Sequence, residues 1–246
     1  MEATAADRRF AEEYRLAREI PRDGLTAWHA AVAAEVALAP GATVLDIGAG
    51  TGAFSTAFRD WFGVRVLAVE PAVALRELIP RTAGIEVLDG RAEALPVPDG
   101  CADAAWLASV VHHIEDLPAA ARELRRALKP GAPVLIRNSF PGRCARDLRV
   151  RFFPGAERIV DGYPTVEETC AAFAAAGFAR VALHAVPQES APSLGEFADR
   201  IRRDADAKLR GLTDDEFARG MRRLRSAAAQ EPGRPAVSWM DLLVLA

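Results

Sequence analysis

The chain has 246 residues, of which 50% are hydrophobic and 26% are charged, so it contains enough apolar material for a large core. Its net charge of -3 argues against a protein that holds nucleic acid by neutralising phosphates. No uncharged apolar run approaches the roughly 18 residues of a membrane-spanning helix. The charged N-terminus lacks the apolar region of a secretory signal, and three widely spaced cysteines suggest neither disulfides nor a zinc site. We therefore expect a cytoplasmic protein with no membrane or nucleic-acid partner.

The first half of the chain predicts alternating helices and strands. Two helices are expected over 3–19 and 25–38, as a cover for the rest of the fold. Strands are then predicted at 43–47, 64–70, 85–90, 102–109 and 132–140, with helices at 53–61, 72–80 and 116–130. Because strands and helices alternate with short connections, we predict an α/β fold, a doubly wound Rossmann-like sheet with right-handed crossovers.

After Phe140 the alternation loosens. Residues 141–160 predict an Arg-rich, partly helical insertion, and a capped helix at 165–178 ends near Gly177. A strand is expected at 179–186, two charged helical stretches at about 193–209 and 213–229, and a last strand at 236–246. The charged segment RIRRDADAKLRG, residues 200–211, is interpreted as an exposed helix. We expect a single domain over 1–246, with a helical cover at 1–40, a core at 40–138, and lids or insertions at 139–163 and 190–230.

The stretch TVLDIGAGTGAFS, residues 43–55, ends a buried strand in three glycines just before a helix. Such a loop lets a ligand approach backbone amides at a helix N-terminus. Gly48, Gly50 and Ala53 also fit the dinucleotide fingerprint, and Glu70 can accept ribose hydroxyls in either kind of site. An NAD(P)-dependent oxidoreductase is therefore one alternative. Asp46 argues against it, because a carboxylate beside the loop would repel a pyrophosphate but suits a ligand with an ammonium group.

Four blocks, VLDIGAGTG, AVEPA, GRAEALPVPDGCADAAW and LKPGAPVLI, follow one another over about 40–138. In this order and spacing they resemble the class I S-adenosylmethionine (SAM)-dependent methyltransferases, in particular the small-molecule, methyltransferase type 11-like branch. The resemblance implies a seven-stranded sheet whose last strand is antiparallel, with 40–138 as the SAM-binding core. It also implies an enzyme of class EC 2.1.1 that converts SAM to S-adenosyl-L-homocysteine (SAH) while methylating a small natural-product or metabolite acceptor.

By the same resemblance, Asp46 would face the amino group of SAM, Glu70 its ribose, and Ala92 and Glu93 its adenine. Relatives often have an aspartate where this chain has Arg91, which leaves the adenine contact to Glu93 or to the backbone. A helix carrying Tyr14 and Arg18 would cover the carboxylate end of the cofactor. The full expected cofactor set is Tyr14, Arg18, Asp46, Gly48, Ala49, Gly50, Gly52, Glu70, Pro71, Ala92, Glu93 and Ser109.

Methyl transfer from a sulfonium is an in-line displacement that depends largely on alignment in a water-poor cleft. A base is needed only where the acceptor atom keeps a proton. His112 and His113, in the loop after the fourth predicted strand, are the candidate catalytic residues because histidine exchanges protons near neutral pH. Alternatively, one histidine packs on the sheet and the other caps the next helix.

The acceptor is expected to meet Arg137, Asn138, Phe152 and Tyr163. Six arginines between Arg137 and Arg158 outnumber the acids there, and guanidinium groups bind carboxylate or phosphate, so an anionic acceptor is one hypothesis and a solvated helix face the other. The strand ends lack the acids of metal-dependent relatives, so no metal is expected. A SAM-binding module without turnover and an enzyme that methylates a macromolecule remain further alternatives. Either a monomer or a homodimer fits the sequence.

Overall fold

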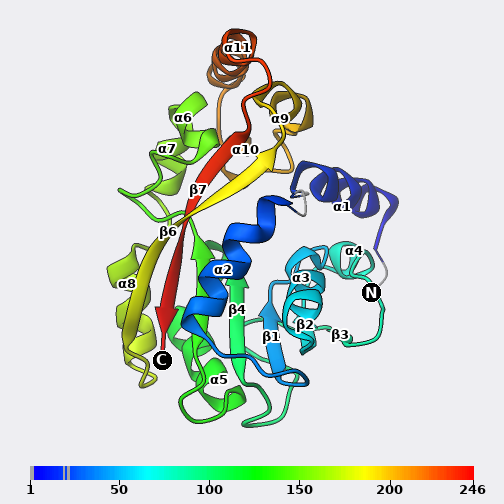
Figure 1. The fold of residues 1–246 in the computed structure, drawn as a ribbon, viewed down its shortest axis with the longest axis vertical. Coiled ribbons are helices and arrows are strands. Elements are labelled where there is room, and N and C mark those ends of the chain that lie inside the picture. The colour runs from blue at the N-terminus through cyan, green and yellow to red at the C-terminus, as the bar shows by residue number, and fades with distance from the viewer. Residues whose placement is uncertain (1–2, 19, 21–22) are drawn as a thin grey trace.

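The computed structural model describes residues 3–18, 20 and 23–246. Seven strands form one sheet in the order β3-β2-β1-β4-β5-β7-β6 (Figure 1). The strands are β1 (Thr43–Ile47), β2 (Arg65–Val69), β3 (Ile85–Leu88), β4 (Ala104–Ala108), β5 (Val134–Asn138), β6 (Arg180–Ala191) and β7 (Ala236–Leu245). The first five strands are parallel, and β7 runs antiparallel to both β5 and β6. The predicted Rossmann-like sheet with an antiparallel last strand is confirmed.

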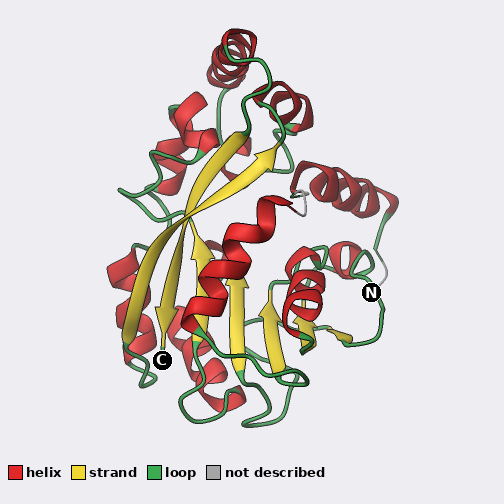
Figure 2. Ribbon diagram, in the orientation of Figure 1, coloured by secondary structure: helices red, strands yellow, loops and turns green. Residues whose placement is uncertain are grey.

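Helices connect most of these strands (Figure 2). They are α1 (Ala5–Arg18), α2 (Thr26–Glu35), α3 (Ala53–Phe62), α4 (Val73–Arg76), α5 (Leu117–Ala127), α6 (Leu148–Phe152), α7 (Gly155–Val160), α8 (Val166–Ala174), α9 (Leu194–Arg200), α10 (Ala207–Arg210) and α11 (Asp214–Gln230), with short 3-10 turns η1 (Asp23–Leu25) and η2 (Val111–His113). Among the described helices, none has the length and apolar character needed to cross a membrane.

The sheet has an apolar core on each face. Successive strand residues point to opposite faces, so Val44 enters one core and Leu45 the other. Helices α2 and α3 cover the Val44 face through side chains such as Trp28 and Phe58. On the Leu45 face, α5 and α8 contribute side chains such as Phe173. This arrangement fixes the carboxyl ends of β1, β4 and β5 at one edge, where ligands bind in open α/β sheets.

A third apolar cluster lies beyond that edge. It is built by α6, α7, α9, α10 and α11, which we call the cap, together with the adjoining end of β7. Phe153, Leu209 and Leu224 are among its buried side chains. Figure 1 shows the cap above the sheet, with the long strands β6 and β7 reaching into it. The two stretches expected as insertions, 139–163 and 190–230, therefore lie together in space.

Several expected elements are shorter in the structure, such as the helix expected at 72–80, which is formed only over Val73–Arg76, and two further differences bear on the site. Strand β6 continues to Ala191, beyond the predicted end at 186, because β7 pairs with it as far as Ala236. The charged stretch 193–209 is not one helix. It stops at Arg200, where Ile201 turns extended, and α10 starts anew after Asp206, whose side chain accepts from the Lys208 amide. Asp206 and Lys208 are buried, so the exposed-helix interpretation of this segment was wrong.

Candidate functional site

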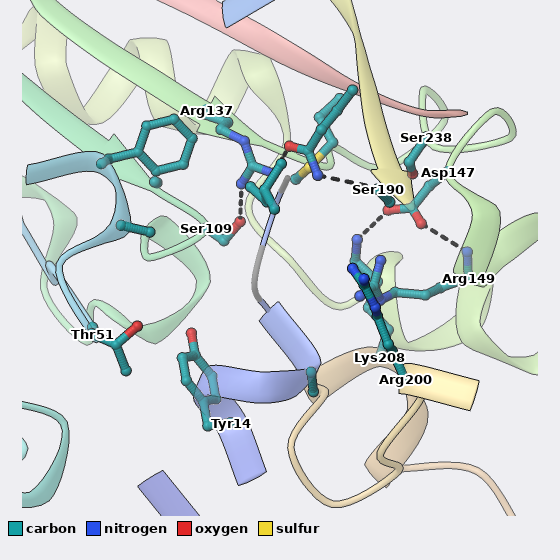
Figure 3. Close-up of a pocket in the computed structure, with 18 of the residues that line it drawn as sticks. Tyr14, Thr51, Ser109, Arg137, Asp147, Arg149, Ser190, Arg200, Lys208 and Ser238 are labelled. Atoms are coloured by element: carbon teal, nitrogen blue, oxygen red, sulfur yellow. Dashed lines mark hydrogen bonds and ion pairs between the residues drawn. The ribbon is translucent and has the colours of Figure 1, made fainter. Parts of the chain in front are cut away.

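A cavity opens at the carboxyl edge of the sheet, between the glycine loop, α1 and the cap (Figure 3). The glycine loop supplies one wall, including Asp46 and Gly50. Arg149 and Lys208 come from the cap on the opposite side. Between them lie residues from β5 and from the extended parts of β6 and β7. Segments far apart in the sequence thus surround one space, and the N-terminal helix brings Tyr14 to it.

The glycine loop presents bare backbone to this cavity. Gly48 and Gly50 have φ of 65° and 58°, in the left-handed region that favours glycine. A Cβ on Gly48 would come within 2.4 Å of the Val110 side chain, whereas one on Gly50 would come within 3.7 Å of the Tyr14 ring. Ala49 lines the cavity beside them. Gly52 instead allows α3 to start close to Ile79, because a Cβ on Gly52 would come within 2.8 Å of that residue.

Asp46 stands at the base of the loop and lines the cavity. Its carboxylate is 1% exposed and accepts a hydrogen bond of 2.5 Å from the Ser55 hydroxyl. Burial raises the pKa of Asp46 to about 7, and the nearby Glu70 carboxylate acts in the same direction. A cationic group of a ligand in the cavity would favour the ionised form of this carboxyl.

Glu70 follows β2 and lies behind the glycine loop. Its two carboxylate oxygens accept the backbone N–H groups of Gly50 at 2.8 Å and Ala72 at 2.9 Å. Burial raises the pKa of Glu70 above its usual value, although these hydrogen bonds oppose the shift. Neither Glu70 nor the exposed Pro71 is among the described residues that line the cavity. Glu70 therefore reaches the site through the Gly50 amide.

The expected adenine-side pair lies away from this cavity. Ala92 is buried in the core on the Leu45 face. Glu93 accepts the backbone N–H of Glu115 at 3.1 Å and approaches Arg91 at 4.0 Å. Neither Ala92 nor Glu93 is among the described residues that line the cavity. The structure thus brings Asp46 and the glycine loop together in one wall and leaves the predicted adenine contacts beside the loop that follows β4.

Ser109 and Arg137 form the middle of the cavity wall. Ser109 has a φ of 57° and is the only non-glycine residue with a positive φ in the described part of the chain. Its hydroxyl accepts from Arg137 Nη1 at 2.9 Å, and its amide donates to the Arg137 carbonyl at 2.7 Å. The Arg137 guanidinium lies 5.0 Å from the Trp28 ring and 5.3 Å from the Phe54 ring. Such contacts fix a buried cation in one orientation.

Gln188 holds the same arginine from β6. Its Oε1 atom accepts hydrogen bonds from Arg137 Nη2 at 2.5 Å and from Trp28 Nε1 at 3.1 Å, and it is buried. Sequence reasoning missed Gln188, because the run from Pro187 to Ser190 resembles a loop rather than a strand. Asn138, expected beside Arg137, instead donates to the Ser139 carbonyl at 3.1 Å and is buried outside the lining of the cavity.

The two histidines lie in η2, just after the cavity-lining Ser109. His112 stacks on Tyr163, with ring centroids 4.0 Å apart and planes 9° apart. His113 is exposed, with its ring centroid 4.1 Å from that of His112. None of these three rings is among the lining residues of the cavity. The structure therefore groups the candidate bases with Tyr163 rather than with the glycine loop.

Phe152 and Arg18 are the remaining residues expected at the site. Phe152 is 6% exposed and belongs to the apolar core of the cap, so it does not line the cavity as predicted. Its neighbour Arg151 lies over its ring. Arg18 is the last residue of α1, and its side chain lies outside the described part of the structure.

The arginines of the 137–158 stretch find acids that are distant in the sequence. Arg143 forms two hydrogen bonds to Asp241, of 2.9 and 3.0 Å, and Arg158 pairs with Glu216. Arg149 pairs with Asp206. Three of the six arginines that suggested an anion-binding insertion are therefore paired with acids in the folded chain.

A buried ion pair ties the cap to the edge of the cavity. Lys208 donates to the Asp147 carboxylate and, at 2.8 Å, to the Ser139 hydroxyl. The same carboxylate accepts the Arg149 amide at 2.9 Å. Burial would raise the pKa of Asp147, but Lys208 and Arg149 outweigh it and the pKa lies below its usual value. No local pattern in the sequence indicates this pair, because 61 residues separate its partners.

Fold and site together define a Rossmann-like α/β protein with a glycine loop and a cavity at the carboxyl edge of its sheet. Residues 45–136 match the family model described as a methyltransferase domain. The chain is 39% identical over 97 residues to a malonyl-[acyl-carrier protein] O-methyltransferase of Serratia marcescens, covering 39% of this chain and 38% of that protein. It is 32% identical over 141 residues to a ubiquinone/menaquinone biosynthesis C-methyltransferase of Caulobacter, covering 52% of this chain and 56% of that protein.

A solved structure shares most of the fold. It is a protein assigned to methyl transfer in an antibiotic biosynthesis pathway of Anabaena variabilis, with a TM-score of 0.71 and 18% identity, covering 89% of this chain and 96% of that chain. By contrast, the chain spans only 32% to 56% of the length of the first curated relatives that it matches. The family model matches residues between β1 and β5 and includes no residue of the cap.

Proposed function

We propose that the protein transfers a methyl group from SAM to a small organic acceptor. The observation that carries this proposal is the position of the Asp46 carboxylate, buried at the base of a bare glycine loop and lining the cavity. A methyltransferase domain match over the same residues supports it. Relatives named for O-methylation and for C-methylation do not share one acceptor atom, so the proposal leaves the methylated atom open.

The residues present fit SAM at this position. Asp46 offers a carboxylate to an ammonium group, and Gly50 leaves the backbone open to a ligand where a side chain would stand, while Gly48 allows the loop to pack against Val110. Tyr14 covers the loop from α1. A pyrophosphate would meet the Asp46 charge instead, which disfavours a nicotinamide dinucleotide. Glu70, Pro71, Ala92 and Glu93 remain the proposed contacts for the nucleoside.

When bound, SAM supplies an electrophilic methyl group, and the protein's contribution is to align the acceptor and to exclude water. Arg137, held by Ser109 and Gln188, is placed to orient an acceptor in the cavity. His112 and His113 are the proposed bases for an acceptor atom that loses a proton. We propose no metal and no nucleic-acid or membrane partner, and either a monomer or a homodimer as the working unit.

Calorimetric titration with SAM, SAH, NADH and NADPH in parallel tests the proposal. We expect saturable binding of the two adenosyl ligands and none of the nicotinamide cofactors. Binding of NADH or NADPH alone would contradict the proposal and favour an oxidoreductase. SAH binding combined with a failure to methylate any acceptor in a broad panel with radiolabelled SAM would favour a binding module.

A further inference from the structure

The cap side of the cavity is rich in fixed positive charge. Arg149, Arg200 and Lys208 line it from α6, α9 and α10, and Arg137 lines it from β5. Figure 3 shows Arg200 and Lys208 projecting toward Asp147. On this side, Asp147 is the one carboxylate among the described lining residues, since Asp46 belongs to the glycine-loop wall. Four cations thus face the part of the cavity that lies beyond the proposed donor site.

Most of these cations are already held by the protein. Lys208 is paired with Asp147 and Arg149 with Asp206, and both ion pairs are almost completely buried. Buried pairs of this kind are rigid, and the fields of their two opposite charges largely cancel. They therefore form a fixed polar wall that does not need to move when a ligand enters, and they leave Arg200 to supply the positive charge that a ligand can meet.

Arg200 differs from its neighbours because its side chain is 39% exposed. Among the described residues, it forms a long ion pair of 3.8 Å with Glu196, which lies one helical turn earlier and is itself 51% exposed. Exposed pairs of this type contribute little free energy, so an incoming anion can replace the contact at small cost. A guanidinium at the cavity edge also matches the bidentate geometry of carboxylate and phosphate.

We propose that the methyl acceptor is an anionic small molecule, a carboxylate or a phosphate ester, whose charged group is bound by Arg200 against the wall formed by Lys208 and Arg149. This inference rests on the proposed methyl transfer and assigns the acceptor class. Arg200 is the specificity-determining residue, because it can release its intramolecular partner. The fixed pairs Lys208–Asp147 and Arg149–Asp206 form the polar wall beside it, whereas Arg143 and Arg158 are engaged elsewhere.

Binding of three matched probes tests the inference. Benzoate, phenyl phosphate and benzamide are titrated calorimetrically into the full chain saturated with SAH, and benzamide serves as the neutral counterpart of benzoate. We expect at least one anion to bind about tenfold or more tightly than benzamide, as one charge-assisted contact predicts. Preference for benzoate or for phenyl phosphate distinguishes a carboxylate acceptor from a phosphate ester.

Two variants make the test specific. Arg200→Gln is expected to remove most of the preference for the anion, while Arg210→Gln, an exposed arginine on α10, removes the same charge and leaves the preference intact. SAH affinity should be unchanged in both. SAH binding with no preference for either anion, or equal weakening by both variants, would overturn the inference alone. No SAH binding by the unaltered protein would instead contradict the proposed function.

Discussion

The backbone amide of Gly50 donates to the Glu70 carboxylate across 2.8 Å, although the two residues lie 20 positions apart. The bond joins the glycine loop after β1 to the end of β2, and it fixes the loop in the shape that faces the cavity. The other Glu70 oxygen accepts the Ala72 amide. One carboxylate therefore positions two backbone segments of the proposed cofactor site.

Replacing Glu70 with alanine should weaken SAH binding about tenfold, because two partly buried amides lose their acceptor and the proposed ribose contact is lost. Calorimetry at one pH measures the effect. Glu86→Ala is the matched control: this glutamate is exposed on β3 and pairs with Arg65, so its loss should leave SAH affinity unchanged. Equal affinities of the Glu70→Ala variant and the unaltered protein would place the nucleoside elsewhere.

Asp46 predicts a pH dependence of stability. Burial raises its pKa from an ordinary value of 3.8 to about 7, so the folded protein holds a proton that the unfolded chain releases. The resulting stabilisation is fully present below 3.8 and is lost as the pH rises through about 7. Urea unfolding across this range should show a falling free energy of unfolding. An Asp46→Asn variant should show a flatter profile, and an identical slope in both proteins would refute the assignment.

The same group predicts the opposite trend for ligand binding. An ammonium group favours the ionised carboxylate, so SAH affinity should increase as the pH rises through about 7. Calorimetric titrations on either side of that pH, in buffers of equal ionic strength, measure the trend. Asp46→Asn should bind SAH weakly at every pH. A variant that retained both affinity and pH dependence would show that another group carries the titration.

The Lys208–Asp147 pair predicts a large, asymmetric effect on stability. Lys208→Met leaves a buried carboxylate without its counter-ion and should lower the free energy of unfolding by about 3–5 kcal/mol. The double variant Lys208→Met/Asp147→Asn should recover part of that loss. Lys129→Met breaks a more exposed pair with Asp103 and should cost about 0–1 kcal/mol. Equal losses for the two lysine variants in urea unfolding would mean that the buried pair has no special role.

His112 and His113 are tested by comparing turnover with binding. Once the acceptor panel with radiolabelled SAM has supplied a substrate, we expect His112→Ala/His113→Ala to reduce the turnover rate by about 100-fold or more, while the SAH affinity stays nearly constant. His184→Ala is the matched control, because this histidine is 46% exposed and pairs with Glu35, so its loss should leave turnover unchanged. Unchanged turnover in the double variant would remove both histidines from the chemistry.

Local patterns were sufficient to predict the parallel part of the fold. Short apolar runs separated by helical segments mark β1 to β5, and the glycine loop carries its own backbone signature. Ser109 was expected near the ligand, but its left-handed conformation could not be predicted, because serine rarely adopts it. The resemblance supplied the roles of Asp46 and Glu70, and those roles remain predictions.

The cap side could not be predicted from local patterns because its contacts join distant segments. Asp206 and Lys208 sit in a run of alternating charges that is typical of a solvated helix, yet both are buried by partners from α6 and the loop before it. Gln188 follows a proline and precedes polar residues, so nothing marks it as part of a strand. Only the pairing of β6 with β7 shows that it faces Arg137.

The pairing of β6 with β7 also determines which side chains line the acceptor side of the cavity. Gln188 and Ser190 alternate with Glu189 along β6, and Gln188 lies opposite Ser238, two residues before Met240 on β7. These four side chains line the cavity, while their neighbours point to the other side. A residue inserted upstream in β6 would turn Pro187 and Glu189 toward the cavity in place of Gln188 and Ser190. One inserted upstream in β7 would do the same with Val237 and Trp239 in place of Ser238 and Met240. A change in strand register would thus replace the side chains on the acceptor side of the cavity without altering the glycine loop.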